Sequence, residues 1–128
     1  MTQEKRILIV DDDPDFVTAI QKILTSAHYR VATAGDLEEG MKAIENDKPD
    51  LILLDVMMEK YDDGFTMCYA LKHDERFREI PIVIITAVTE VTGLKFSPET
   101  DGEYLEADGY LQKPISAETL LTTVKQLV

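Results

Sequence analysis

Three short stretches of the chain are almost purely apolar and rich in β-branched residues, and each is followed by a polar residue. These stretches are residues 6–10, 51–54 and 82–85. An uninterrupted apolar run of this length suits a strand that is buried on both faces, as strands are in a parallel sheet. Two weaker runs, residues 30–33 and 109–112, have the same character. The pattern therefore predicts five strands.

The segments between these runs carry apolar residues at the spacing of a helix face. Asp13-Pro14 precedes the first segment and Asp36 the second, where an aspartate caps a helix and a proline fits its first turn. A third helix follows Gly64, and the last starts at Ser116, which supplies only the N-cap half of a capping box. The expected buried faces are Phe16, Ala19, Ile20, Ile23 and Leu24; Leu37, Met41 and Ile44; Phe65, Cys68, Tyr69 and Leu71; and Leu120, Leu121, Val124 and Leu127.

Strands that alternate with helices of this length predict right-handed βαβ units. The expected fold class is therefore α/β, a doubly wound sheet of five parallel strands with helices on both faces. Residues 89–108 fit this order less well, because Gly93, Pro98 and Gly102 interrupt them and six acidic residues accompany a single basic one, Lys95. There we expect an irregular acidic loop with a shortened helix at most.

Length and composition fit one compact domain. The chain has 128 residues, 45% of them apolar, which allows one core and leaves no room for a second domain of ordinary size. No apolar run could span a bilayer and no signal peptide follows Met1, so we expect a cytoplasmic protein that enters no membrane. Cys68 is the single cysteine and is expected to be a small core residue rather than half of a disulfide.

The chain is strongly acidic, with 25 Asp and Glu against 13 Lys and Arg and a net charge of −12. This charge weighs against direct binding of nucleic acid, whose phosphates it would repel. Residues 1–64 hold 15 acidic and 7 basic residues, a net charge of −8. The position of those acids therefore matters more than their number.

Acids follow two of the predicted strands, and a hydroxyl and a cation follow two others. Asp11 and Asp12 follow the first strand, Asp55 the third, Thr86 the fourth, and Lys113 comes just after the fifth. The carboxyl ends of parallel strands meet at one edge of the sheet, which is where such folds bind ligands. Carboxylates that converge there repel one another unless a cation compensates. Mg²⁺ prefers such a set of oxygen ligands, so the sequence predicts a magnesium site.

Three other interpretations of these acids fit less well. Asp11, Asp13 and Asp15 match the first ligands of an EF-hand loop, but Phe16 and Lys22 stand where that loop needs Gly and Glu. No glycine-rich nucleotide-binding motif follows any strand. Asp11-x-Asp13 is also similar to the motif of haloacid-dehalogenase-type phosphatases, but that fold usually has a larger core and would leave Asp55 and Thr86 without counterparts.

Over essentially its whole length the sequence resembles the receiver domain of bacterial two-component response regulators, in a stand-alone, chemotaxis-regulator-like form. The stretches that carry the resemblance are ILIVDDDPD (7–15), PDLILLDVMM (49–58) with DGF (63–65), PIVIITA (81–87) and DGYLQKPIS (108–116). Each stretch is moderate evidence by itself, whereas the four in this order and spacing are highly specific.

The resemblance implies a flavodoxin-like (βα)5 receiver fold and a role for each strand-end residue. Asp55 matches the aspartate that accepts a phosphoryl group. Asp11 and Asp12 match the acidic pair that binds Mg²⁺ together with Asp55 and the backbone carbonyl of Met57. Thr86 and Tyr110 match the pair of switch residues, and Lys113 matches the lysine that contacts the phosphoryl group.

The function expected from this resemblance is a phosphorylation-dependent signalling switch rather than an enzyme. Its partners would be a histidine kinase or histidine phosphotransfer protein and a downstream protein that reads the face formed by residues 86–128. We expect residues 1–128 to form a receiver domain without an output domain, as a monomer or a weak phosphorylation-dependent dimer. A phosphate sink or relay intermediate, an Asp-nucleophile phosphatase and a module that is never phosphorylated remain alternatives.

Two segments depart from the family pattern. The loop 57–64 lacks the usual proline, and the apolar side chains of Met57 and Val88 beside the site predict slow self-dephosphorylation. The 26 residues between Thr86 and Lys113 are several more than usual. They suggest a partner-specific surface at residues 96–104, unless the apolar side chains there fold back into the core. His28 and His73 are expected to be surface residues.

Overall fold

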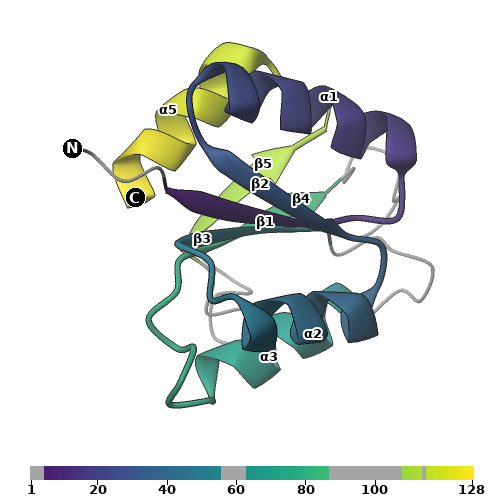
Figure 1. Cartoon of the computed structure of the whole chain (residues 1–128), viewed down its shortest axis with the longest axis vertical. Coiled ribbons are helices and arrows are strands. Elements are labelled where there is room, and N and C mark those ends of the chain that lie inside the picture. Colours follow the sequence, from purple (N-terminus) through teal and green to yellow (C-terminus); the bar gives the residue numbers. More distant parts are fainter. Residues whose placement is uncertain (1–4, 56–62, 87–107, 114) are drawn as a thin grey trace, which may run out of the picture.

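The computed structural model describes residues 5–55, 63–86, 108–113 and 115–128. In that part of the chain, five parallel strands form one sheet in the spatial order β2-β1-β3-β4-β5 (Figure 1). They are β1 (Arg6–Val10), β2 (Arg30–Ala34), β3 (Leu51–Asp55), β4 (Ile82–Thr86) and β5 (Gly109–Gln112). All five predicted strands are confirmed, each within one residue of its expected bounds.

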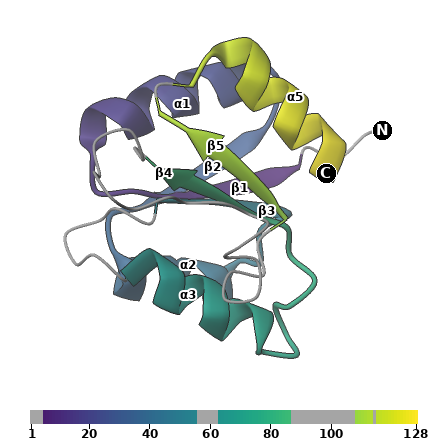
Figure 2. The ribbon, with the colours of Figure 1, turned by 180° about the vertical axis from the view of Figure 1, so that it is seen from behind.

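Helices cover both faces of the sheet. They are α1 (Pro14–Ser26), α2 (Leu37–Asn46), α3 (Asp63–Lys72) and α5 (Ala117–Leu127). Helices α1 and α5 lie on one face and α2 and α3 on the other, which both views of the ribbon show (Figures 1 and 2). The doubly wound α/β fold is therefore confirmed. The irregular segment expected at 89–108 lies outside the described residues, apart from Asp108.

Each face of the sheet has its own hydrophobic core. Ile7 and Ile9 of β1 pack in the cluster beneath α1 and α5, and Leu8 and Val10 pack in the cluster on the α2 and α3 side. The three central strands β1, β3 and β4 are thus buried on both faces, which explains why their sequences are uninterrupted apolar runs. β2 and β5 lie at the edges of the sheet, where the weaker runs were found.

Side-chain caps begin three of the helices where the sequence placed them. The Asp13 carboxylate accepts hydrogen bonds from the backbone N–H groups of Asp15 and Phe16, and the Asp36 carboxylate accepts one from Glu39. The Ser116 hydroxyl oxygen accepts one from the Thr119 N–H at 3.1 Å. These bonds satisfy backbone donors that have no partner inside the helix, and they confirm the three predicted caps.

Two residues predicted to be buried are exposed. Tyr69 keeps 60% of its surface in solvent because α3 turns Met67, Cys68 and Leu71 toward the sheet, and position 69 lies about 200° around the helix from position 67. Its ring instead stacks on that of His73, 4.1 Å away between centroids. Ala19 is also exposed, and Val17 packs against the core in its place.

Among the described residues no helix is long and apolar enough to span a membrane. His28 and His73 are both exposed, as predicted. His28 is the C′ residue of α1 and adopts a positive φ of 72°. The Tyr29 N–H donates to the Leu24 carbonyl and the His28 N–H to the Thr25 carbonyl, so the helix ends in a Schellman motif.

Candidate functional site

Three carboxylates meet at the carboxyl edge of the sheet. Asp11 and Asp12 directly follow β1, and Asp55 ends β3, the strand paired with β1 through Val10 and Leu54. One carboxylate oxygen from each aspartate lies within 4.8 Å of the others. Asp11 and Asp55 are only 3% and 2% exposed, and Asp12 is exposed. The acidic cluster is therefore buried at its base and open on one side.

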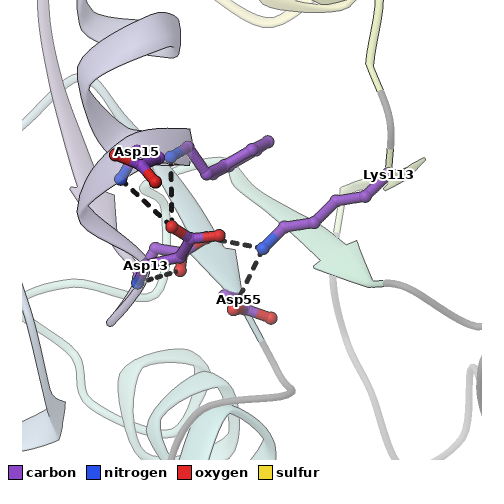
Figure 3. Close-up of polar contacts among 6 residues, drawn as sticks. Asp13, Asp15, Asp55 and Lys113 are labelled. Carbon is purple, nitrogen blue, oxygen red and sulfur yellow. Dashed lines mark hydrogen bonds and ion pairs between the residues drawn. The ribbon is translucent and has the colours of Figure 1, made fainter.

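Lys113 brings an ammonium group into this cluster from the far edge of the sheet. It directly follows β5, which pairs with β4, so its side chain must pass the end of β4 to reach the acids. Figure 3 shows the extended side chain pointing toward Asp55. The Lys113 Nζ lies 3.0 Å from Asp11 Oδ2 and 3.4 Å from Asp55 Oδ2. One cation thus joins two buried carboxylates that come from different strands.

The Lys113 ammonium also lies over an aromatic ring, a contact that the sequence pattern does not predict. Its Nζ is 4.1 Å from the centroid of the Phe16 ring. Phe16 was assigned only to the buried face of the first helix, and it is partly buried there. The available signal was an aromatic residue in the first turn of a helix that starts beside strand-end acids. The two residues are far apart in sequence, so their contact can be inferred only when the order of the strands in the sheet is known.

The carboxyl group of Asp11 has a perturbed pKa. Burial raises the pKa of Asp11 to about 6, and the negative charge of Asp55 acts in the same direction. The Asp13 N–H, which donates to Asp11 Oδ1 at 2.9 Å, and the Lys113 ammonium oppose this rise in pKa. For Lys113, burial lowers the pKa, but the hydrogen bond and charge of Asp11 together with the charge of Asp55 outweigh burial, and the net pKa is raised.

The donor atoms of the cluster suit a hard divalent cation. All three side chains offer carboxylate oxygens, the ligands that Mg²⁺ prefers. Asp11 Oδ2 is buried and forms an ion pair with the Lys113 ammonium, 3.0 Å away. Three ionised carboxylates against one ammonium leave an excess of negative charge. A bound divalent cation would compensate for that charge and give Asp11 Oδ2 a second partner beside Lys113.

The structure brings together four of the predicted site residues, namely Asp11, Asp12, Asp55 and Lys113. Thr86 ends β4, but its side chain lies outside the description, and Met57 lies outside the described residues altogether. Tyr110 pairs with Ile84 in the register of β4 and β5 and is partly buried against the α2 and α3 side of the sheet. The predicted surface at 96–104 and Val88 also fall outside the described residues.

The comparisons with a family model and with curated proteins agree on one family. The model of the response regulator receiver domain matches residues 7–125. The chain is 38% identical over 123 residues to the DNA-binding dual master transcriptional regulator RpaA of Synechocystis, and 39% identical over 128 residues to the alkaline phosphatase synthesis transcriptional regulatory protein PhoP of Bacillus subtilis. These alignments cover 96% and 97% of this chain but 48% of each relative, so the chain spans about half their length.

A solved structure agrees with the sequence matches. The chemotaxis response regulator CheY4 of Vibrio cholerae superimposes with a TM-score of 0.84 at 29% identity. The match covers 98% of this chain and all of that chain. The likeness extends over the whole sheet and both helical layers rather than over the acidic cluster alone.

Proposed function

Since this chain belongs to the family of response regulator receiver domains, we propose that it is a phosphorylation-dependent switch of a two-component phosphorelay in which Asp55 accepts a phosphoryl group from a phosphohistidine. One observation carries this proposal. The Asp55 carboxylate lies within 4.8 Å of those of Asp11 and Asp12 and 3.4 Å from the Lys113 ammonium. Three carboxylates and a fixed positive charge thus lie together, which is the arrangement that the proposed transfer requires.

The proposed reaction is an in-line displacement at phosphorus. A carboxylate oxygen of Asp55 forms the new P–O bond while the P–N bond to the donor imidazole breaks, and the electron pair of that bond stays on the ring nitrogen. A carboxylate is a weak nucleophile, so the rate depends on position and on neutralising the phosphoryl oxygens. Lys113 is the residue that would supply a point charge to those oxygens, because its Nζ already contacts Asp55.

The cofactor in this proposal is Mg²⁺, held by Asp11, Asp12, Asp55 and the backbone carbonyl of Met57. When bound, it would contribute positive charge and a fixed orientation to the phosphoryl oxygens. The oxygen-only donor set and the excess of three carboxylates over one ammonium support this assignment. The Asp13 N–H donates to Asp11 Oδ1, the other oxygen of this carboxylate. This bond would leave Oδ2 available for the cation.

Phosphorylation would then act through the switch residues. The acyl phosphate adds charge and acceptor oxygens at the end of β3. The Thr86 hydroxyl would donate to one of these oxygens, and Tyr110 would rotate in response. This exchange would shift a two-state equilibrium of the face formed by residues 86–128. Support comes from the backbone pairing of β4 with β5, because Thr86 lies on β4 and Tyr110 on β5.

The proposed partners are a histidine kinase or histidine phosphotransfer protein upstream and a protein target downstream. No multiple-turnover activity on other substrates is expected, only self-phosphorylation and slow self-dephosphorylation. A phosphate sink or relay intermediate would form the same adduct but pass it on without a downstream target. An Asp-nucleophile phosphatase would instead hydrolyse phosphate esters continuously.

The test is phosphorylation of the purified chain with acetyl phosphate and Mg²⁺, followed by intact mass and amide NMR. Wild type should gain one acid-labile phosphoryl group, and beryllofluoride should produce a similar set of shift changes. Asp55→Ala should show neither. Asp15→Asn is the matched control because it removes an exposed carboxylate from the same region without touching the acidic cluster. An unmodified wild type, or turnover of a phosphate ester, would reject the proposal.

A further inference from the structure

The Lys113 ammonium contacts a neutral group as well as two charged ones. Asp11 Oδ2 and Asp55 Oδ2 lie 3.0 Å and 3.4 Å from its Nζ, and the Phe16 ring centroid lies 4.1 Å away. A cation this close to an aromatic ring face is attracted by the negative potential above the ring. The side chain is 20% exposed, so solvent weakens this attraction only in part.

The Phe16 ring is held in place by the fold. Phe16 lies in the first turn of α1 and packs against the hydrophobic cluster between the sheet, α1 and α5. Its backbone N–H donates to the Asp13 carboxylate at 3.3 Å. The Asp13 N–H in turn donates to Asp11 Oδ1. One tight turn therefore fixes both the aromatic ring and the buried carboxylate that contact the same ammonium.

A neutral partner has a specific advantage at this position. During phosphoryl transfer, Lys113 must exchange carboxylate contacts for contacts with phosphoryl oxygens. A third carboxylate beside it would compete with those oxygens for the ammonium. An aromatic face attracts the cation without a formal charge or a lone pair, and it tolerates small displacements of the cation across the ring.

We propose that Phe16 is a positioning residue for Lys113, whose ring face keeps the ammonium at the mouth of the acidic cluster while its hydrogen-bond partners change. The consequence for phosphorylation rests on the proposed function, whereas the contact itself does not. Phe16 does not touch the reacting atoms in this scheme. It preorganises the group that does.

A series of fluorinated phenylalanines at position 16 separates attraction from packing. Each fluorine weakens the negative potential of the ring but changes its size little. In the full chain with Mg²⁺ and acetyl phosphate, the phosphorylation rate should fall stepwise with fluorine number, roughly three- to tenfold in total. Phe16→Trp should keep the wild-type phosphorylation rate. Phe16→Leu should be phosphorylated as slowly as the variant with the most fluorinated ring. Rates that do not follow the electrostatic order would overturn the proposal.

An NMR readout tests the contact without any phosphoryl donor. In the metal-free protein, the ε-methylene protons of Lys113 should be shifted upfield by the ring current of Phe16, and Phe16→Leu should abolish that shift. Tyr29→Leu is the matched control, because Tyr29 is an aromatic packed on the same cluster beyond the far end of α1. It should change neither the shift nor the rate.

The two readouts also distinguish the possible failures. A wild type that takes no phosphoryl group overturns the proposed function and the positioning role with it. A phosphorylated wild type with a flat fluorine series overturns the positioning role alone. A missing ring-current shift contradicts the contact itself.

Discussion

The Lys72 ammonium donates a 2.8 Å hydrogen bond to the Asp108 carboxylate and so joins the end of α3 to the start of β5. The same ammonium donates to the carbonyls of Arg78 and Ile80 at 3.2 Å and 3.0 Å. Asp108 Oδ2 also accepts the N–H of Ile82, the first residue of β4. These bonds lie at the amino edge of the sheet, opposite the acidic cluster. They fix the start of the edge strand that carries Tyr110 and leads into Lys113.

Replacing Lys72 by Met should destabilise the fold markedly. The Lys72 side chain is only 9% exposed, so its loss removes this donor from two carbonyls and leaves Asp108 Oδ2 with the Ile82 N–H, at a cost of about 2 kcal/mol. Urea denaturation measures this change in the free energy of unfolding. Lys42→Met is the matched control, since the exposed pair of Lys42 with Glu38 is worth less than about 0.5 kcal/mol. Equal losses in the two variants would show that the buried bonds contribute nothing.

Replacing His28 by Gly should stabilise the protein by about 0.5–1 kcal/mol. His28 holds a φ of 72°, which a side chain disfavours and glycine adopts freely, although glycine also gains freedom in the unfolded chain. His28→Ala keeps the Cβ and should give no gain. His73→Gly, at an exposed position outside the positive-φ region, should lower the melting temperature, whereas His28→Gly should raise it.

Replacing Gly40 by Ala should destabilise the protein by about 1 kcal/mol, even though alanine favours helices. A Cβ at position 40 would lie 3.0 Å from Met67 Cε and 3.3 Å from Val10 Cγ2. A Cβ at this position would therefore force the side chains of Met67 and Val10 to shift by a few tenths of an ångström. Shortening the neighbour with Met67→Val should make the double variant less destabilised than the sum of the single ones. Additive losses in chemical denaturation would argue against the contact.

The fold and the base of the site could be predicted because they depend on short-range patterns. Apolar runs marked the buried strands, and the chain order of strands and helices implied that the ends of β1 and β3 would meet. Asp11, Asp12 and Asp55 were therefore placed together without any knowledge of contacts.

Other features depend on how distant segments pack. The bond between Lys72 and Asp108 joins residues 36 positions apart, and neither residue carries a local signal for it. To predict the contact of Phe16 with Lys113, one must know the order in the sheet of all the strands that lie between them. Tyr69 was misplaced because apolar spacing alone does not give the rotation of a short helix about its axis, which is set by the side chains of Met67 and Leu71 packing on the sheet.

The raised pKa of Asp11 gives a pH dependence with a definite sign. Its folded pKa is about 6, mainly because of burial, against an ordinary value of 3.8 in the unfolded chain. Between these two values the folded state binds the extra proton, so stability falls as the pH rises through this range. Ionised Asp11 therefore destabilises the metal-free protein above about pH 6.

Asp11→Asn should accordingly stabilise the metal-free protein by about 1–2 kcal/mol near neutral pH, measured by denaturation in EDTA. The gain should shrink as the pH falls toward about 4, where Asp11 is protonated in the folded wild type. Added Mg²⁺ should reverse the order of stability of the two proteins, because it stabilises a protein with three carboxylates more than one with two.

Asp74→Asn provides a control of opposite sign. Hydrogen bonds from Arg76 lower the pKa of Asp74, so loss of this carboxylate should destabilise the protein at neutral pH and matter less in acid. An Asp11→Asn variant less stable than wild type in EDTA would mean that the Lys113 ion pair outweighs burial.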